Sequence, residues 1–192
     1  MADTANILAL SPIPHDSEVA VAPLGTVLPT TATSALGIAF KDLGNVTDDG
    51  VVNGVKRDTT KHYNWGGKVV KVTTDRYTET IKVTLYESSP DVLKTVFGTS
   101  NVTVSSVSGH QIMTVEHSPL QLTHNCFAFT GIDGSRTVRT IIRNGQITEI
   151  GDIVMVHNKP TVYELTIDVF ETAAGENGVV QYFDYADVLS GS

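Results

Sequence analysis

Alternation of apolar and polar residues predicts β-strands in two stretches of the 192-residue chain. In residues 77–87, one parity holds Tyr77, Glu79, Ile81, Val83 and Leu85, and the other parity is polar. In residues 161–171, Tyr163, Leu165, Ile167 and Val169 face away from Glu164, Thr166 and Asp168. Successive side chains of a strand point to opposite faces, so each stretch is expected to be buried on one side. Threonine and valine, which favour strands, are frequent elsewhere, and the chain is predicted to be mainly β.

Turn residues suggest how these strands are connected. Asn144-Gly145 lies between β-rich runs in residues 137–150 and predicts a hairpin, because this pair accommodates the positive φ angles of a type I′ turn. Gly131 to Ser135 is expected to be a loop between strands, since the Gly-x-Ser-x-Gly pattern of a nucleophile turn is absent. Asp48-Asp49-Gly50 is expected to be a simple turn, because the spaced carboxylates of a calcium loop are missing.

One short helix is predicted over residues 89–97. Ser88 and Ser89 supply an N-cap, Pro90 suits the first turn, and Asp91 lies near the positive end of the helix. Gly98 ends the segment. The side chains expected to pack on a sheet are Val92, Leu93, Val96 and Phe97.

Two segments show no clean periodicity and are interrupted by proline or glycine. Residues 1–19 are interpreted as an arm, and residues 45–67 as a long excursion from the core. Long irregular stretches in a compact protein are usually functional or disordered.

Composition and charge narrow the possible functions. With 41% hydrophobic and 18% charged residues, the chain has the composition of a soluble globular protein, expected to form one large domain or two small ones. No apolar run approaches the roughly 20 residues of a membrane span, and the N-terminus lacks the basic region of a signal peptide, so no membrane partner and a cytoplasmic site of synthesis are expected.

The formal net charge of −8 is divided unevenly along the chain. Residues 1–148 have a balance of −1, and residues 149–192 a balance of −7. Residues 56–82 hold seven Lys or Arg and three acids. A net acidic protein does not grip nucleic acid non-specifically, because that requires Lys and Arg at the phosphates.

Candidate chemistry is sparse. Cys126 is the single cysteine and is interpreted as a buried small apolar residue. His110, His117 and His124 recur every seven residues, which puts neighbours on opposite faces of a strand, so solvated histidines are favoured over a metal cluster. No nucleophile, base and orienting group fall into a recognisable arrangement, and we expect no catalytic residues, no metal and no cofactor.

A succession of short blocks carries a family resemblance. They are residues 21–26 (VAPLGT), 28–31 (LPTT), 40–44 (FKDLG), 48–51 (DDGV), 65–67 (WGG) and 91–97 (DVLKTVF), followed by the strand in residues 160–175 and an aromatic, acidic terminal segment. In order and spacing they are similar to the major tail tube proteins of long-tailed, siphovirus-type bacteriophages, especially those of actinobacteria. The match covers about two thirds of the chain.

The resemblance implies a β-sandwich or barrel with one flanking short helix, an extended loop and an N-terminal arm. Residues 1–23 are expected to be the arm and residues 24–192 a single domain, with residues 44–67 as an inter-ring loop. Hexameric rings are expected to stack into a virion tail tube, assembled in the host cytoplasm, through which genomic DNA passes without specific binding. The implied partners are further copies of the chain, tail-tip and tape measure proteins, and the tail terminator.

Residue assignments follow from this expectation. The candidates for contacts between subunits or rings are Val46, Asp48, Asp49, Val51, Lys56, Arg57, Lys61 and Trp65. Trp65 is equally consistent with burial under a loop. Glu164, Thr166 and Asp168 are lumen candidates, with an outward or interface position as the alternative.

The alternative function is a β-sandwich binding module for carbohydrate or a virion surface. It is disfavoured, because one tryptophan and 7% aromatic residues provide few stacking platforms.

Overall fold

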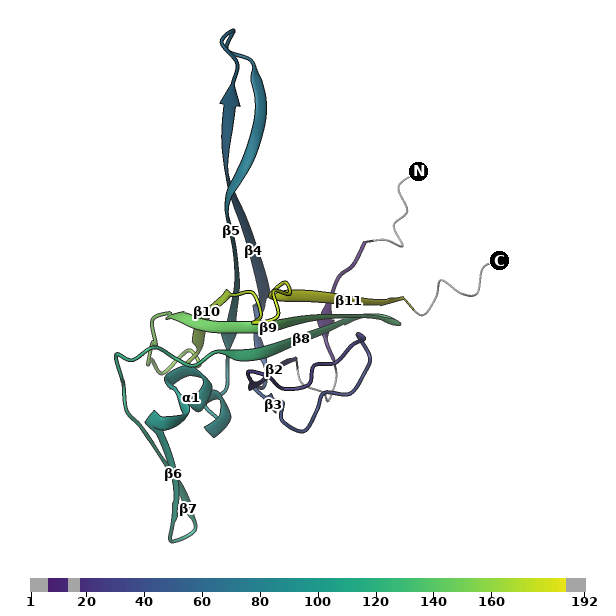
Figure 1. Ribbon diagram of the computed structural model, residues 1–192. Coiled ribbons are helices and arrows are strands. Elements are labelled where there is room, and N and C mark those ends of the chain that lie inside the picture. The colour runs from purple at the N-terminus through teal and green to yellow at the C-terminus, as the bar shows by residue number, and fades with distance from the viewer. Residues whose placement is uncertain (1–6, 14–17, 186–192) are drawn as a thin grey trace.

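The computed structural model describes residues 7–13 and 18–185, which form a mainly β protein (Figure 1). This confirms the predicted fold class. The elements are β1 (Ser11–Pro12), β2 (Val19–Pro23), β3 (Lys41–Asp42), β4 (Val46–Tyr63), β5 (Val69–Leu85), α1 (Pro90–Phe97), the 3-10 turn η2 (Thr99–Asn101), β6 (Val102–Val107), β7 (His110–Val115), β8 (Asn125–Asp133), β9 (Arg136–Ile150), β10 (Tyr163–Val169) and β11 (Val179–Tyr185).

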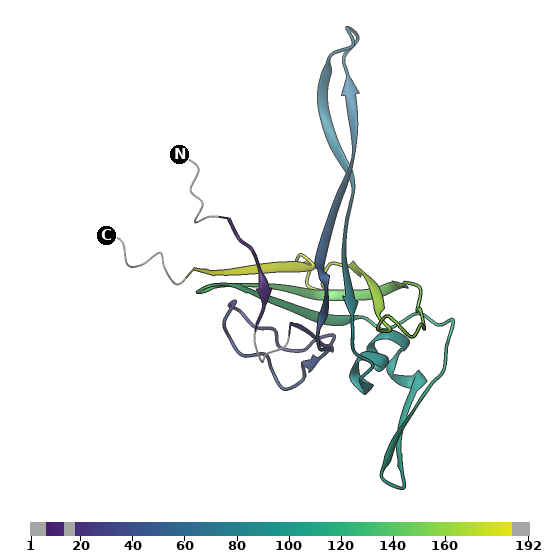
Figure 2. The same ribbon diagram turned by 180° about the vertical axis from the view of Figure 1, so that it is seen from behind.

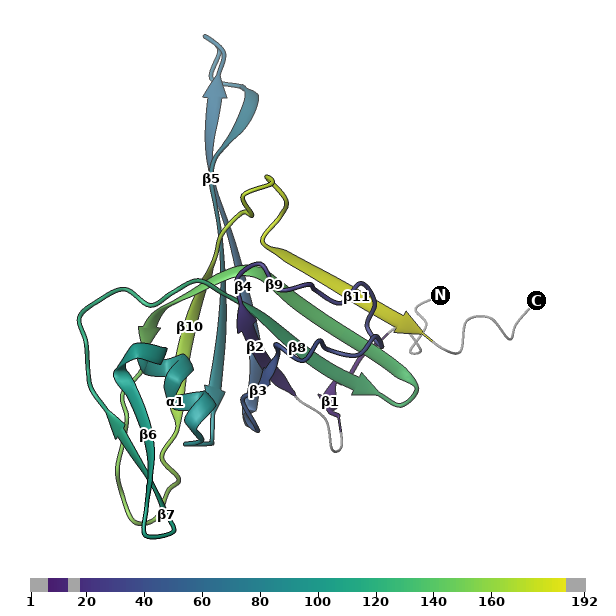
Figure 3. The same ribbon diagram turned by 60° about the horizontal axis from the view of Figure 1, so that its bottom comes forward.

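Nine of these strands form one antiparallel sheet in the order β3-β2-β8-β9-β10-β5-β4. β1 adds to β8, and β11 adds to β9. β10 and β11 lie end to end along the same edge of β9, where Val169 pairs with Gly145 and Val179 pairs with Ile142 (Figure 3). β6 and β7 form a separate two-stranded sheet.

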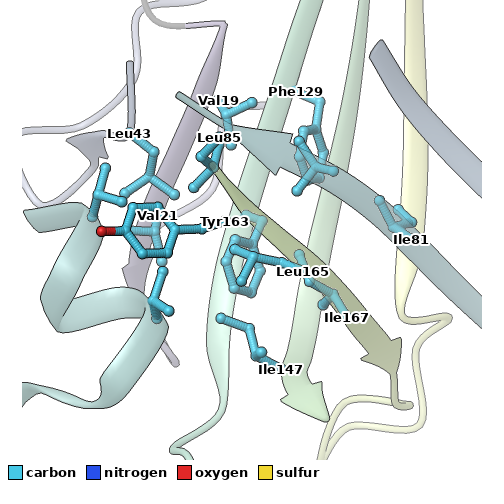
Figure 4. Packing of buried hydrophobic residues seen from close by; sticks show 14 of the residues in the cluster. Val19, Val21, Leu43, Ile81, Leu85, Phe129, Ile147, Tyr163, Leu165 and Ile167 are labelled. Carbon is cyan, nitrogen blue, oxygen red and sulfur yellow. The ribbon is translucent and has the colours of Figure 1, made fainter. Parts of the chain in front are cut away.

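The main core lies between one face of the large sheet and α1 (Figure 4). The predicted alternation is confirmed in β10 and in the C-terminal end of β5, where both strands border the core. Ile81, Val83 and Leu85 from β5 and Tyr163, Leu165 and Ile167 from β10 are all buried in this core. Phe127 and Phe129 from β8 fill the space beside them.

α1 begins and ends at the residues that the sequence indicates. The Ser89 hydroxyl accepts a hydrogen bond from the Val92 backbone N–H, at 3.3 Å, and Pro90 occupies the first turn. At the other end, the Gly98 N–H donates to the Lys94 carbonyl with a φ of 94° at Gly98, a backbone conformation that suits glycine. Val92, Leu93 and Val96 are buried against the sheet, and Phe97 is half-buried.

A loop, residues 24–40, covers part of the other face of the sheet. Leu28, Leu36 and Phe40 pack there on Ala20, Ala128 and Ile141. The buried Arg139 of β9 fastens this loop, because its guanidinium donates to the Ser34 and Thr31 carbonyls and to the Thr130 hydroxyl. Hydrogen bonds to a buried charge offset part of the cost of removing it from water.

The hairpin predicted at Asn144-Gly145 is wrong. Both residues lie within the continuous strand β9, and Gly145 does not have a positive φ. Glycine is required at this position because there is no room for a side chain. A Cβ there would lie 2.9 Å from methyl carbons of Ile142 and Ile167. The turn between β8 and β9 is at Gly134 and Ser135, at the end of the stretch expected to be a loop, whereas Gly131 and Asp133 belong to β8.

The assignment of residues 1–23 to an arm is also wrong at its C-terminal end. β2 pairs with β8 inside the sheet, and Val19, Ala20, Val21 and Ala22 are buried. This run shows no alternation because the strand is covered on both faces, by the main core on one side and by the loop at 24–40 on the other. Residues 1–6 and 14–17 of the expected arm lie outside the described residues.

Replacing Gly145 by alanine is expected to destabilise the fold, because the added methyl overlaps Ile142, Ile167 and Phe127. Overpacking of this kind costs about 1–3 kcal/mol. Urea unfolding measures the change. The control is Gly37→Ala, where a Cβ meets no atom within 4 Å, and which should stay within about 1 kcal/mol of the parent. Equal midpoints for the two variants would contradict the close packing at Gly145.

Candidate assembly surface

The most prominent feature is the β4–β5 hairpin, which projects far from the sheet (Figure 1). The irregular loop predicted at residues 44–67 is therefore wrong in its secondary structure: it is β4 and the tip of this hairpin, although it does leave the core. None of the residues 56–78 is buried. Both faces of the ribbon meet solvent, so its sequence has no reason to alternate between apolar and polar residues.

Side chains on the hairpin hold its two strands together. On one face, the Arg57 guanidinium lies 5.1 Å from the centre of the Tyr77 ring, and the Tyr77 hydroxyl donates to Glu79 at 2.7 Å. The hydrogen bond to Glu79, followed by desolvation and the charge of Glu79, raises the pKa of Tyr77. Closer to the tip, Thr60 donates to Asp75 across the two strands. These contacts stiffen a ribbon that has no hydrophobic core of its own.

The tip presents Trp65 on an ordered turn. The Asn64 N–H donates to the Lys68 carbonyl, the Gly67 N–H donates to the Asn64 carbonyl, and the Asn64 side chain accepts from the Lys68 N–H, each at 2.9 Å. Gly67 has a φ of 77°. Trp65 is fully exposed, at 106%, which overturns its alternative placement under a loop.

The other interface candidates are divided between the shaft and the base of the hairpin. Lys56, Arg57 and Lys61 are exposed on the shaft, where Lys56 forms an ion pair with Asp58 at 3.2 Å. Val46, Asp48, Asp49 and Val51 lie at the base, around a break in register between Val46 and Val51. The simple turn predicted at Asp48-Asp49-Gly50 is wrong, because these residues form an irregularity within β4, with a φ of 68° at Gly50.

The three lumen candidates share the polar face of β10, opposite the main core. Glu164 is exposed, and Thr166 and Asp168 are half-buried. Thr166 pairs with Lys82 of β5 on one side and with Glu149 of β9 on the other. The β10 segment of the sheet therefore carries acids and one cation on a face that α1 does not cover.

A second projecting hairpin, β6–β7, was not anticipated. It extends on the side of the sheet away from the β4–β5 hairpin, and Figure 2 shows the same arrangement from behind. Val104, Val107, Ile112 and Met113 are exposed on it, and residues 102–115 contain no Asp, Glu, Lys or Arg. Its turn is Ser108-Gly109, both with positive φ. Ser-Gly is a turn signal between β-rich runs, so the hairpin was detectable from the sequence.

His117, His124 and Cys126 each contact other groups of the protein. The His117 ring lies 4.7 Å from the Phe97 ring, tilted by 50°, and His124 shares a 2.6 Å hydrogen bond with the Asn144 side chain. Cys126 is buried, as expected, and burial raises the pKa of its thiol. Within residues 7–13 and 18–185, no three His, Cys, Asp or Glu side chains gather as a metal site. No helix in this part of the chain is long and apolar enough to cross a membrane.

Exposed apolar side chains on two projecting hairpins are typical of a subunit that associates with other proteins. A family model described as "Phage tail tube protein" matches residues 6–182. The chain belongs to the phage tail tube protein family and is a structural protein of the tail of virion-like particles.

Three solved structures are similar to the chain at low identity. An anti-feeding prophage tube-terminating cap is 13% identical over 96% of this chain and 100% of that chain, with a TM-score of 0.49. A sheath-tube complex of an extracellular contractile injection system is 12% identical over 94% and 98%, with a TM-score of 0.45. A native gene transfer agent particle is 11% identical over 88% and 96%, with a TM-score of 0.41. No curated protein matches the chain.

Shortening the hairpin is expected to leave the fold intact. In the variant, Asn-Gly replaces residues 56–78 and joins Val55 to Glu79, which already pair across the ladder. Because no residue in the removed segment is buried, the free energy of unfolding should stay within about 1 kcal/mol of the parent. Urea unfolding followed by circular dichroism measures it. Loss of the cooperative transition would show that the hairpin stabilises the core.

Proposed function

We propose that the chain assembles into hexameric rings, that the rings stack into the tail tube, and that genomic DNA passes through its bore. The observation that carries the proposal is the position of the β4–β5 hairpin on one side of the sheet and of β6–β7 on the other (Figure 1). A subunit with different surfaces on opposite sides makes head-to-tail contacts, and such contacts propagate into a filament. The domain from residue 24 onward, extended to include β2, is the ring-forming unit.

Contacts within a ring are proposed to form through the open edges of the sheet. β4 is the last strand of the sheet path, and among the described strands none pairs with its outer edge or with the outer edge of β11. Unpaired strand edges invite association with another chain, and closure into a barrel removes them. Pairing between neighbouring subunits satisfies these edges without any catalytic chemistry.

The bore is proposed to be lined by the polar face of β10. Glu164, Thr166 and Asp168 lie beside Glu149 of β9, so acids outnumber the single nearby Lys82. A surface of this sign repels phosphate and lets DNA pass without binding. Tail-tip, tape measure and terminator proteins are the proposed partners at the ends and inside the tube.

Negative-stain electron microscopy of the concentrated protein, with and without tail-tip proteins as initiator, tests the proposal. The parent chain is expected to form rings or hollow tubes. The variant with the shortened hairpin is expected to form rings that do not stack, because it keeps the sheet edges and loses the projecting ribbon. A parent chain that stays monomeric at every concentration and salt, with initiator present, would refute the proposal, and normal tubes from the shortened variant would refute the role of the hairpin.

The basic shaft of the hairpin is proposed to contribute attraction to the acidic C-terminal quarter of a neighbouring subunit. Replacing Lys56, Arg57 and Lys61 by glutamine is expected to raise the concentration needed for assembly and to weaken its salt dependence, because screening acts only on the charges that remain. Pelleting assays across a salt series measure both quantities.

The matched control replaces Lys41, Lys94 and Arg136, three cations that lie outside both the hairpin and residues 149–192, by glutamine. Since it changes the net charge equally, it separates a local contact from a general charge effect. Identical salt dependence of the hairpin variant and the parent would rule out the electrostatic contribution.

A further inference from the structure

The tip of the β4–β5 hairpin combines exposed apolar side chains with positively charged ones. Three backbone and side-chain hydrogen bonds fix the turn that carries Trp65. Tyr63 and Val70 are also exposed beside it, at 60% and 62%. Residues 59–74 contain Lys61, Lys68 and Lys71 and no acid. Because hydrogen bonds hold the backbone of this turn in one conformation, little backbone freedom is lost when the tip binds, which favours association.

A cleft of about 660 Å³ lies on the side of the sheet that carries α1. It is bounded by the end of α1, the segment at residues 117–122 and the end of β9 with the turn that follows. Its apolar lining includes Val96, Phe97, Leu120, Leu122, Ile150 and Ile153. Asp152 is exposed at its margin, and no Lys or Arg lines it.

We propose that Trp65 of one subunit inserts into this cleft on a second copy of the chain in the adjacent ring. This inference rests on the proposed stacking of rings and names the receiving surface. The tip and the cleft match in chemistry: the exposed indole and Val70 meet the apolar side chains of the cleft, and lysines meet the Asp152 carboxylate. The cleft volume falls in the range of about 300–1,000 Å³ in which proteins bind small ligands, which is ample for one indole.

The geometry makes the occupant a second copy and not the same chain. Figures 1 and 3 show the hairpin on one side of the sheet and α1 on the other, so a tip cannot reach the cleft of its own subunit. The contact is therefore heterologous, and each subunit offers one tip and one cleft. Tryptophan in a desolvated pocket with a charged margin is a common composition for an interface hot spot.

Fluorescence of Trp65 tests burial directly, because it is the only tryptophan in the chain. On assembly of the parent protein, with tail-tip proteins as initiator, emission is expected to shift to shorter wavelength, and quenching by acrylamide is expected to fall severalfold relative to free subunits. Trp65→Ala should raise the concentration needed for tube formation at least about tenfold. Trp65→Phe should need a concentration between those of the parent and Trp65→Ala.

Disulfide trapping identifies the receiving surface. In a Cys126→Ala background, Trp65→Cys combined with Leu120→Cys should give a ladder of covalent multimers when tubes are oxidised. The matched control combines Trp65→Cys with Ile38→Cys, because Leu120 and Ile38 are both exposed apolar residues but only Leu120 lines the cleft. The control should give no ladder.

The outcomes separate this inference from the function on which it rests. Tubes in which Trp65 stays as quenchable as in free subunits, or tubes cross-linked through Ile38 and not Leu120, overturn the inference and leave the tube function standing. A parent protein that forms neither rings nor tubes with initiator present overturns both.

Discussion

The antiparallel ladder along β9 is the interaction on which the rest of the structure depends. β9 pairs with β8 on one edge and with both β10 and β11 on the other. Through β8 it holds β2 and β1, and through β10 it holds β5 and hence the projecting β4–β5 hairpin. Gly145 lies where β9 changes partner from β11 to β10, and its missing side chain lets Ile142, Ile167 and Phe127 close over that point. The projecting hairpin is thus connected, through β5 and β10, to the strands that carry the main core.

Sequence patterns predicted strands that are buried on one face only. They failed for strands whose two faces are both buried or both exposed. β10 and the inner end of β5 alternate because one face is buried and the other wet, and α1 was found from Ser89, Pro90 and Gly98. β2 escaped detection because both of its faces are buried, and the outer part of the hairpin because both of its faces are exposed. Asn144-Gly145 misled because the glycine is required by crowding and not by backbone conformation. Turn chemistry alone does not distinguish these two uses of glycine.

The segment that forms the candidate surface was predicted from the sequence, but its three-dimensional form was not. Family resemblance pointed to the segment around Trp65 and the lysines, and the structure places these residues on a projecting ribbon. The family resemblance could not point to the cleft near Leu120. That surface is assembled from α1, residues 117–122 and the end of β9, which are distant in the sequence. Complementary surfaces of this kind become visible only when the topology brings their parts together.

A subunit with its long hairpin on one side only gives any head-to-tail stack an intrinsic direction. In the stack proposed above, one end would present unoccupied Trp65 tips, and the other end would present empty apolar clefts with Asp152 at their margin. The proteins that terminate the two ends must then differ in chemistry, one offering an apolar recess and the other a basic aromatic plug. Growth, capping and attachment are consequently inequivalent at the two ends, although every building block is the same.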